Sequence, residues 1–83
     1  MISFRQIVLT RIKAAEGEKE IEEVIDSSIQ KLKIKNVNGH IIQRFIIGME
    51  SSLLLARTEQ VSEKDIHNMN FAISLFKGLQ KHS

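Results

Sequence analysis

Apolar side chains recur every three or four residues along four segments of the chain, which is the spacing of one face of an α-helix. The segments cover roughly residues 2–15, 18–35, 39–57 or 58, and 62–81. The pattern therefore predicts an all-α fold: a compact bundle of three to four helices, with residues 1–83 as a single helical domain. The third segment has the most apolar positions, so we expect the third helix at the centre of the bundle.

Each segment has one face that we expect to be buried. In the first two segments this face consists of Phe4, Ile7, Val8, Ile12 and Ala15, and of Ile21, Val24, Ile25, Ser28, Ile29 and Leu32. In the third segment it consists of Ile41, Ile42, Phe45, Ile46, Met49, Leu53 and Ala56. In the fourth segment it consists of Ile66, Met69, Ala72, Ile73, Phe76 and Leu79. Together these faces are the predicted hydrophobic core.

Residues with turn or capping preferences separate the segments. Gly17 interrupts the first apolar pattern, and we expect it to stop the first helix. The acidic run over residues 18–23 falls at the start of the second segment, where carboxylates favour the positive end of the helix dipole. Asn38 and Ser62 precede the third and fourth segments, and their side chains can accept hydrogen bonds from first-turn N–H groups. We therefore expect N-caps at both positions.

One stretch also fits a β-hairpin. Residues 32–35 alternate apolar and basic side chains, and the dipeptide Asn38-Gly39 favours a two-residue hairpin turn. The returning arm, residues 41–47, has its apolar residues in adjacent pairs, which suits a helix and not a strand. An α+β fold with a hairpin around Asn38-Gly39 remains the alternative to the all-helical fold.

Three large apolar residues have no place on the predicted buried faces. Ile47 and Leu54, seven residues apart, fall nearly opposite the buried face of the third helix, and Leu55 points in a further direction. Phe71 lies well off the buried face of the fourth helix. Because exposed apolar patches commonly mark a partner surface, Ile47, Leu54 and Phe71 are the candidate interface.

The composition supports the same hypothesis. The 83 residues are 42% hydrophobic and 27% charged, which is ordinary for a globular domain, and a chain this short forms only a marginal core. The absence of cysteine excludes a disulfide framework, so dense helix packing or self-association must stabilise the fold. We expect a small non-enzymatic protein–protein interaction module, a homo-oligomer, with a symmetric dimer as the default.

Nucleic-acid binding is the alternative function, directly or through a nucleic-acid-binding partner. The chain carries 12 Lys and Arg against 10 Asp and Glu, and the two signs alternate along it, so the sequence predicts no single basic face. The run Lys31, Lys33 and Lys35 is interpreted as a solvated charge run. If the third segment were a recognition helix, its N-terminal end would offer only His40, Gln43 and Arg44 as polar contacts.

The sequence shows no catalytic, cofactor or metal motif. No two of the histidines His40, His67 and His82 share a helix at a spacing of four, and no carboxylate joins them at metal-ligand spacing. No glycine-rich phosphate loop or nucleophile elbow is present. Gly48 and Ser52, four residues apart, are instead expected to let another helix approach closely. We therefore expect that the protein is not an enzyme and takes no cofactor.

No segment is expected to enter a membrane. The longest apolar tract, residues 41–56, contains Gln43, Arg44 and Glu50 and is too polar to span a bilayer. The acidic half of the second segment would be repelled by anionic lipid. Charged residues also interrupt the apolar stretch near the N-terminus, so we expect no secretory signal and a cytoplasmic protein.

Overall fold

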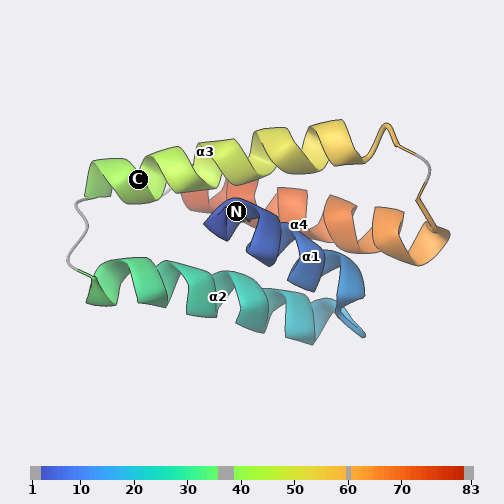
Figure 1. Ribbon diagram of the computed structural model, residues 1–83, viewed down its shortest axis with the longest axis horizontal. Coiled ribbons are helices and arrows are strands. Elements are labelled where there is room, and N and C mark those ends of the chain that lie inside the picture. The colour runs from blue at the N-terminus through green and yellow to red at the C-terminus, as the bar shows by residue number, and fades with distance from the viewer. Residues whose placement is uncertain (1–2, 36–38, 60, 82–83) are drawn as a thin grey trace.

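The computed structural model describes residues 3–35, 39–59 and 61–81, and these residues form four helices (Figure 1). The helices are α1 Phe4–Ala14, α2 Glu18–Ile34, α3 Gly39–Ala56 and α4 Glu63–Lys81. The predicted all-α fold is confirmed, because both arms of the alternative hairpin are helical. The expected N-cap Asn38 lies outside the described residues.

The helices pack as a bundle in which α1 crosses between α2 and α3, with α4 behind it (Figure 1). Successive helices from α2 to α4 run antiparallel (Figure 1). The most extensive helix–helix interface joins α3 and α4, which agrees with the central position expected for the third helix. The α4 helix also contacts both α1 and α2, so it shares that central position.

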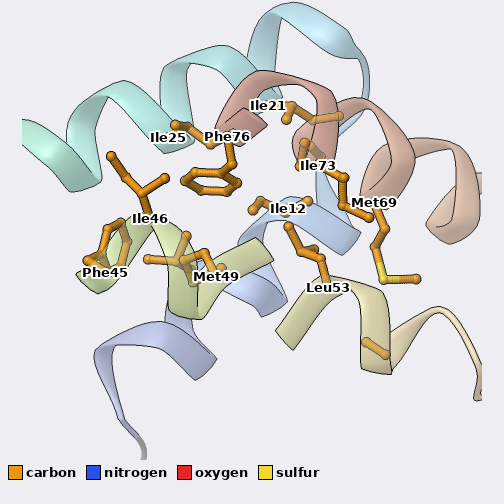
Figure 2. Close-up of a cluster of buried hydrophobic side chains, with 14 of the residues drawn as sticks. Ile12, Ile21, Ile25, Phe45, Ile46, Met49, Leu53, Met69, Ile73 and Phe76 are labelled. Carbon is orange, nitrogen blue, oxygen red and sulfur yellow. The ribbon is translucent and has the colours of Figure 1, made fainter. Parts of the chain in front are cut away.

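The core is built from the predicted apolar faces of all four helices (Figure 2). Phe76 at its centre is fully buried, and its ring meets that of Phe45 edge-on with centroids 6.3 Å apart. Phe4 approaches the other side of Phe45, with centroids 5.5 Å apart. Three phenylalanines therefore link α1, α3 and α4, since aromatic pairs at these distances add to the stabilisation that burial supplies.

Some predicted core positions lie at the edge of the core. These residues are each 36–42% exposed: Ile7, Ile41, Ile66 and Leu79. Each stands at the margin of its apolar face or close to a helix end, where the neighbouring helices no longer cover it. The apolar pattern thus identified the faces correctly and overestimated their width.

The helix ends partly follow the prediction. The Asp65 N–H donates to Ser62 Oγ at 3.1 Å, so Ser62 caps α4 as expected. Ser3, which was not predicted as a cap, forms a reciprocal capping box with Gln6 at the start of α1. Gly17 does not stop α1, which ends at Ala14; it is the N-cap residue of α2, with an extended backbone that any residue can adopt.

Side chains of α4 hold the connection between α1 and α2. The buried Asn68 side chain donates from Nδ2 to the carbonyl oxygens of Ile12, Lys13 and Ala15, at 2.9–3.2 Å. These carbonyls lie at the C-terminal end of α1, where backbone acceptors lack their usual helical partners, and only the Ile12 oxygen also accepts from a backbone N–H there, that of Ala15 at 3.3 Å. Lys64, one turn before Asn68 on α4, forms an ion pair with Glu16, with 3.6 Å between Nζ and the carboxylate.

Candidate interaction surfaces

The outward face of α3 carries a row of exposed aliphatic side chains. Ile47 is 52% exposed, Leu54 38% and Leu55 70%, whereas the adjacent Leu53 is fully buried. Ile47 and Leu54 lie almost in line, because seven residues make nearly two helical turns, and the exposed Ser51 lies between them. We call Arg44, Ile47, Ser51, Leu54 and Leu55 the α3 outer surface.

The charged groups at the α3 outer surface are basic. Arg44 is exposed one turn before Ile47. The one carboxylate within α3, that of Glu50, accepts a hydrogen bond from the Gln80 amide and so is turned toward α4. The outer surface therefore combines aliphatic side chains with a guanidinium group, and the partly exposed Glu50 at its edge is hydrogen-bonded to Gln80.

A second guanidinium reaches the flank of α3 from α1. A Cβ atom added at Gly48 would stand 3.2 Å from Arg5 Cδ and would also meet the guanidinium group. The absence of a side chain at Gly48 thus makes room for Arg5. The sequence predicted that another helix would approach α3 closely at Gly48 and Ser52; at Gly48 the group that approaches is the Arg5 side chain of α1. Since Gly48 lies one turn after Arg44 on the helix, Arg5 adds positive charge beside the α3 outer surface.

Phe71 does not share a surface with Ile47 and Leu54. It is half-buried and packs against the core. On α4, Phe71 lies one turn after His67 and one turn before Leu75, so the three share one face of the helix. That face meets α2, because His67 stands 3.4 Å from Glu18 and Leu75 lines a groove between α2 and α4. The structure therefore brings two of the three candidate residues together and places Phe71 on another side of the bundle.

An open groove of about 520 Å³ runs between α2 and α4. Its floor is aliphatic and consists of Ile25 and Ile29 from α2 and Leu75 and Leu79 from α4. Gly78 widens the groove, because a Cβ atom added there would meet no described atom within 4 Å. We call this depression the α2–α4 groove.

The rim of the α2–α4 groove is acidic. Glu22, Glu23 and Asp26 line it with one base, Lys19. All four side chains belong to the exposed side of α2. Within the described residues, none of the three carboxylates takes part in an ion pair. The groove therefore offers an apolar floor and uncompensated negative charge.

The bundle also separates charges that alternate along the sequence. The C-terminal end of α2, with its exposed lysines 31, 33 and 35, lies at the same end of the molecule as the start of α3 (Figure 1). A hollow of about 380 Å³ lined by Arg5, Leu32 and Arg44 joins α1, α2 and α3 there. The acidic first turns of α2 and α4 meet at the opposite end, where His67 contacts Glu18.

Catalytic and metal-binding groups do not assemble in the part of the chain that the structure describes. His40 and His67 are both exposed on different helices, and His82 lies outside the described residues. Among the described residues, no three His, Asp or Glu side chains come close enough to hold a metal ion. None of the described helices combines the length and apolar character needed to span a bilayer.

Comparison with protein-family models, curated protein sequences and solved structures finds no match to this chain. The functional argument therefore rests on the two surfaces described above.

Sequence reasoning missed two features of these surfaces. Leu55 is the most exposed apolar residue of α3, yet it was not among the candidate residues. Leu55 stands eight residues after Ile47, and residues four and eight positions apart lie on the same side of a helix. This spacing could have identified Leu55 as a neighbour of Ile47. The α2–α4 groove had no such signal, since it lies between two helices that are not consecutive in the chain.

Proposed function

We propose that this chain is a small non-enzymatic protein–protein interaction module that forms homo-oligomers through the α3 outer surface. The observation that carries the proposal is the row of Ile47, Leu54 and Leu55, which the other three helices leave uncovered. The cytoplasm, expected from the sequence, is the proposed location.

Burial of these side chains supplies the driving force. Full burial of an aliphatic side chain contributes about 1.5–3 kcal/mol relative to exposure, so three partly exposed residues offer several kcal/mol to a partner. Their clustering matters more than their number, because singly scattered apolar residues are normal on a protein surface. Ile34, which is 78% exposed at the end of α2 and lies outside this row, serves as a control.

The test compares the wild-type protein with the double variant Ile47→Ser/Leu55→Ser and the control Ile34→Ser. Light scattering after size exclusion at micromolar concentration gives the mass, and circular dichroism verifies that the helices remain. We expect the wild type and the control to exceed the monomer mass of 9.5 kDa and the double variant to be monomeric. A monomeric wild type, or a folded double variant that associates as the wild type does, would overturn the proposal.

The second candidate function is binding of a nucleic-acid phosphate backbone at the basic end of the molecule. It is favoured by Arg5 and Arg44, which line one hollow together with Leu32 of α2, at the end of the bundle where α2 carries its exposed lysines (Figure 1). Phosphate contacts release counterions, so such binding weakens steeply as salt rises. A mobility shift with duplex DNA or RNA that vanishes between 50 and 200 mM salt, roughly the range over which this effect is large, would support it. No shift at low salt would exclude it.

A further inference from the structure

We propose that the α2–α4 groove receives the α3 outer surface of a second copy of this chain, so that copies associate head to tail. The inference rests on the proposed function, because it names the surface that the α3 outer surface meets. It differs from the symmetric dimer expected from the sequence, in which α3 would pair with itself.

The floor of the groove matches the aliphatic row of α3 in chemistry. Ile25 and Ile29 are almost fully buried at its base, and Leu75 and Leu79 are partly exposed along its α4 side. A volume of about 520 Å³ is within the range of sites that bury a ligand of several side chains, roughly 300–1,000 Å³. The groove can therefore take the apolar side chains of Leu54 and Leu55.

The charges around the two surfaces are opposite in sign. The groove is rimmed by Glu22, Glu23 and Asp26 against Lys19 alone. The α3 outer surface presents Arg44, with Arg5 at its flank. Opposite potentials on two facing patches steer association and fix its register. The carboxylates are free to meet these guanidinium groups, since they form no ion pair within the described residues.

Pairing of α3 with α3 lacks this complementarity. The carboxylate of Glu50, next to Ile47 and Leu54 on α3, is already engaged by the Gln80 amide of its own copy. A two-fold contact would therefore remove Arg44 from water without an acid opposite it, which is unfavourable for a buried charge. The acidic groove supplies the missing partner, and this difference decides between the two arrangements.

A head-to-tail contact uses different surfaces on the two copies, so the assembly retains an unused groove at one end and an unused α3 outer surface at the other. Such contacts generate rings when the rotation closes and open chains when it does not. Association should therefore proceed beyond the dimer as concentration rises.

The experiment uses two variants of the full chain, each defective in one surface. Leu55→Glu places a carboxylate on the α3 outer surface at a position that is 70% exposed. Gly78→Gln fills the groove from within α4, where the structure leaves room for a side chain and where glutamine favours the helix more than glycine. Gly39→Gln is the matched control, since Gly39 is a helical glycine with open space outside the groove.

Sedimentation velocity and native mass spectrometry are applied to each variant alone and to an equimolar mixture in which one is isotope-labelled. We expect both variants to be monomeric alone and the mixture to form a 1:1 heterodimer that grows no further, while Gly39→Gln behaves as the wild type. The mixture stops at the dimer because its two remaining surfaces are both defective. Raising the salt from 0.1 to 1 M should weaken the heterodimer, because screening shortens from about 10 Å to 3 Å.

The outcomes separate the two proposals. If Gly78→Gln associates as the wild type does while Leu55→Glu is monomeric, the α3 surface mediates association and the groove does not, which overturns the inference alone. If the wild type itself is monomeric, the proposed function fails first. A mixture without heterodimers, although each variant is folded and monomeric, also overturns the inference.

Discussion

Asn68 is a buried polar residue that ties the end of α1 to α4. Its amide group is 3% exposed and donates to three carbonyl oxygens at the end of α1. A buried acceptor that loses its donor keeps its desolvation penalty, which makes such a side chain harder to replace than an exposed one. The ordinary appearance of an asparagine in a polar stretch conceals this role.

We expect Asn68→Ala to lower the free energy of unfolding by about 1–3 kcal/mol, because it removes the amide donor from the carbonyls of Lys13 and Ala15 and leaves that of Ile12 only the 3.3 Å bond from the Ala15 N–H. Asn70→Ala is the control: Asn70 is exposed and accepts a hydrogen bond from Arg57 at 2.7 Å, so its loss should stay within about 0.5 kcal/mol. Urea unfolding monitored by circular dichroism measures both. Equal losses for the two variants would contradict the assigned role.

The three consecutive leucines of α3 report the rotation of that helix. Leu53 is fully buried, Leu54 is 38% exposed and Leu55 is 70% exposed. Only one orientation of α3 about its axis gives this order. The same orientation places the α3 outer surface in solvent. The stabilities of leucine variants therefore test whether this surface is exposed in the monomer.

Leu53→Ala should destabilise the monomer by about 2–5 kcal/mol, which can unfold so small a domain, because it creates a cavity in the core. Leu55→Ala should change the stability by less than about 0.5 kcal/mol, since its side chain is largely in water. Thermal unfolding at low micromolar concentration, where association contributes least, compares them. A Leu55→Ala loss as large as that of Leu53→Ala would mean that α3 is rotated differently.

At the scale of the helices, the interior glycine of α3 and that of α4 have different reasons to be there. Gly48 makes room for Arg5, whereas Gly78 faces the open α2–α4 groove. Glycine destabilises a helix interior relative to alanine in either case. Only at Gly48 does a neighbouring side chain oppose the replacement.

Gly78→Ala should therefore raise the free energy of unfolding by about 0.5–1 kcal/mol, the usual difference in helix propensity. Gly48→Ala should yield a smaller gain, because the Arg5 side chain must first move away. Chemical denaturation of the two single variants measures the difference. A larger gain at Gly48 than at Gly78 would contradict the packing of Arg5 described above.

The elements were largely predictable from the sequence, and the surfaces were not. Periodicity located four helices and their buried faces, and a serine before an apolar segment located the Ser62 cap. Ile47 and Leu54 were found by helix geometry alone. Phe71 was placed with them because a sequence does not show which neighbour covers a given face; in the fold, Phe71 lies on the α2 side of α4.

At the scale of the whole molecule, the fold converts an alternating charge pattern into opposite ends and opposite surfaces. The lysine-bearing end of α2 lies at the same end of the bundle as the start of α3, and the acidic first turns of α2 and α4 lie at the other end (Figure 1). An acidic groove and a basic aliphatic surface then coexist on one small domain. Neither surface is explained by the stability of the monomer, and the association that we propose uses both.

The most direct test of the α3 outer surface is a dilution series followed by NMR of isoleucine and leucine methyl groups. We predict that the methyl signals of Ile47, Leu54 and Leu55 shift with protein concentration, because association removes these side chains from water. The signals of Ile34, exposed on α2, should stay unchanged. Methyl signals of Ile47, Leu54 and Leu55 that do not move over the same range, or an Ile34 signal that moves as far as theirs, would contradict the account.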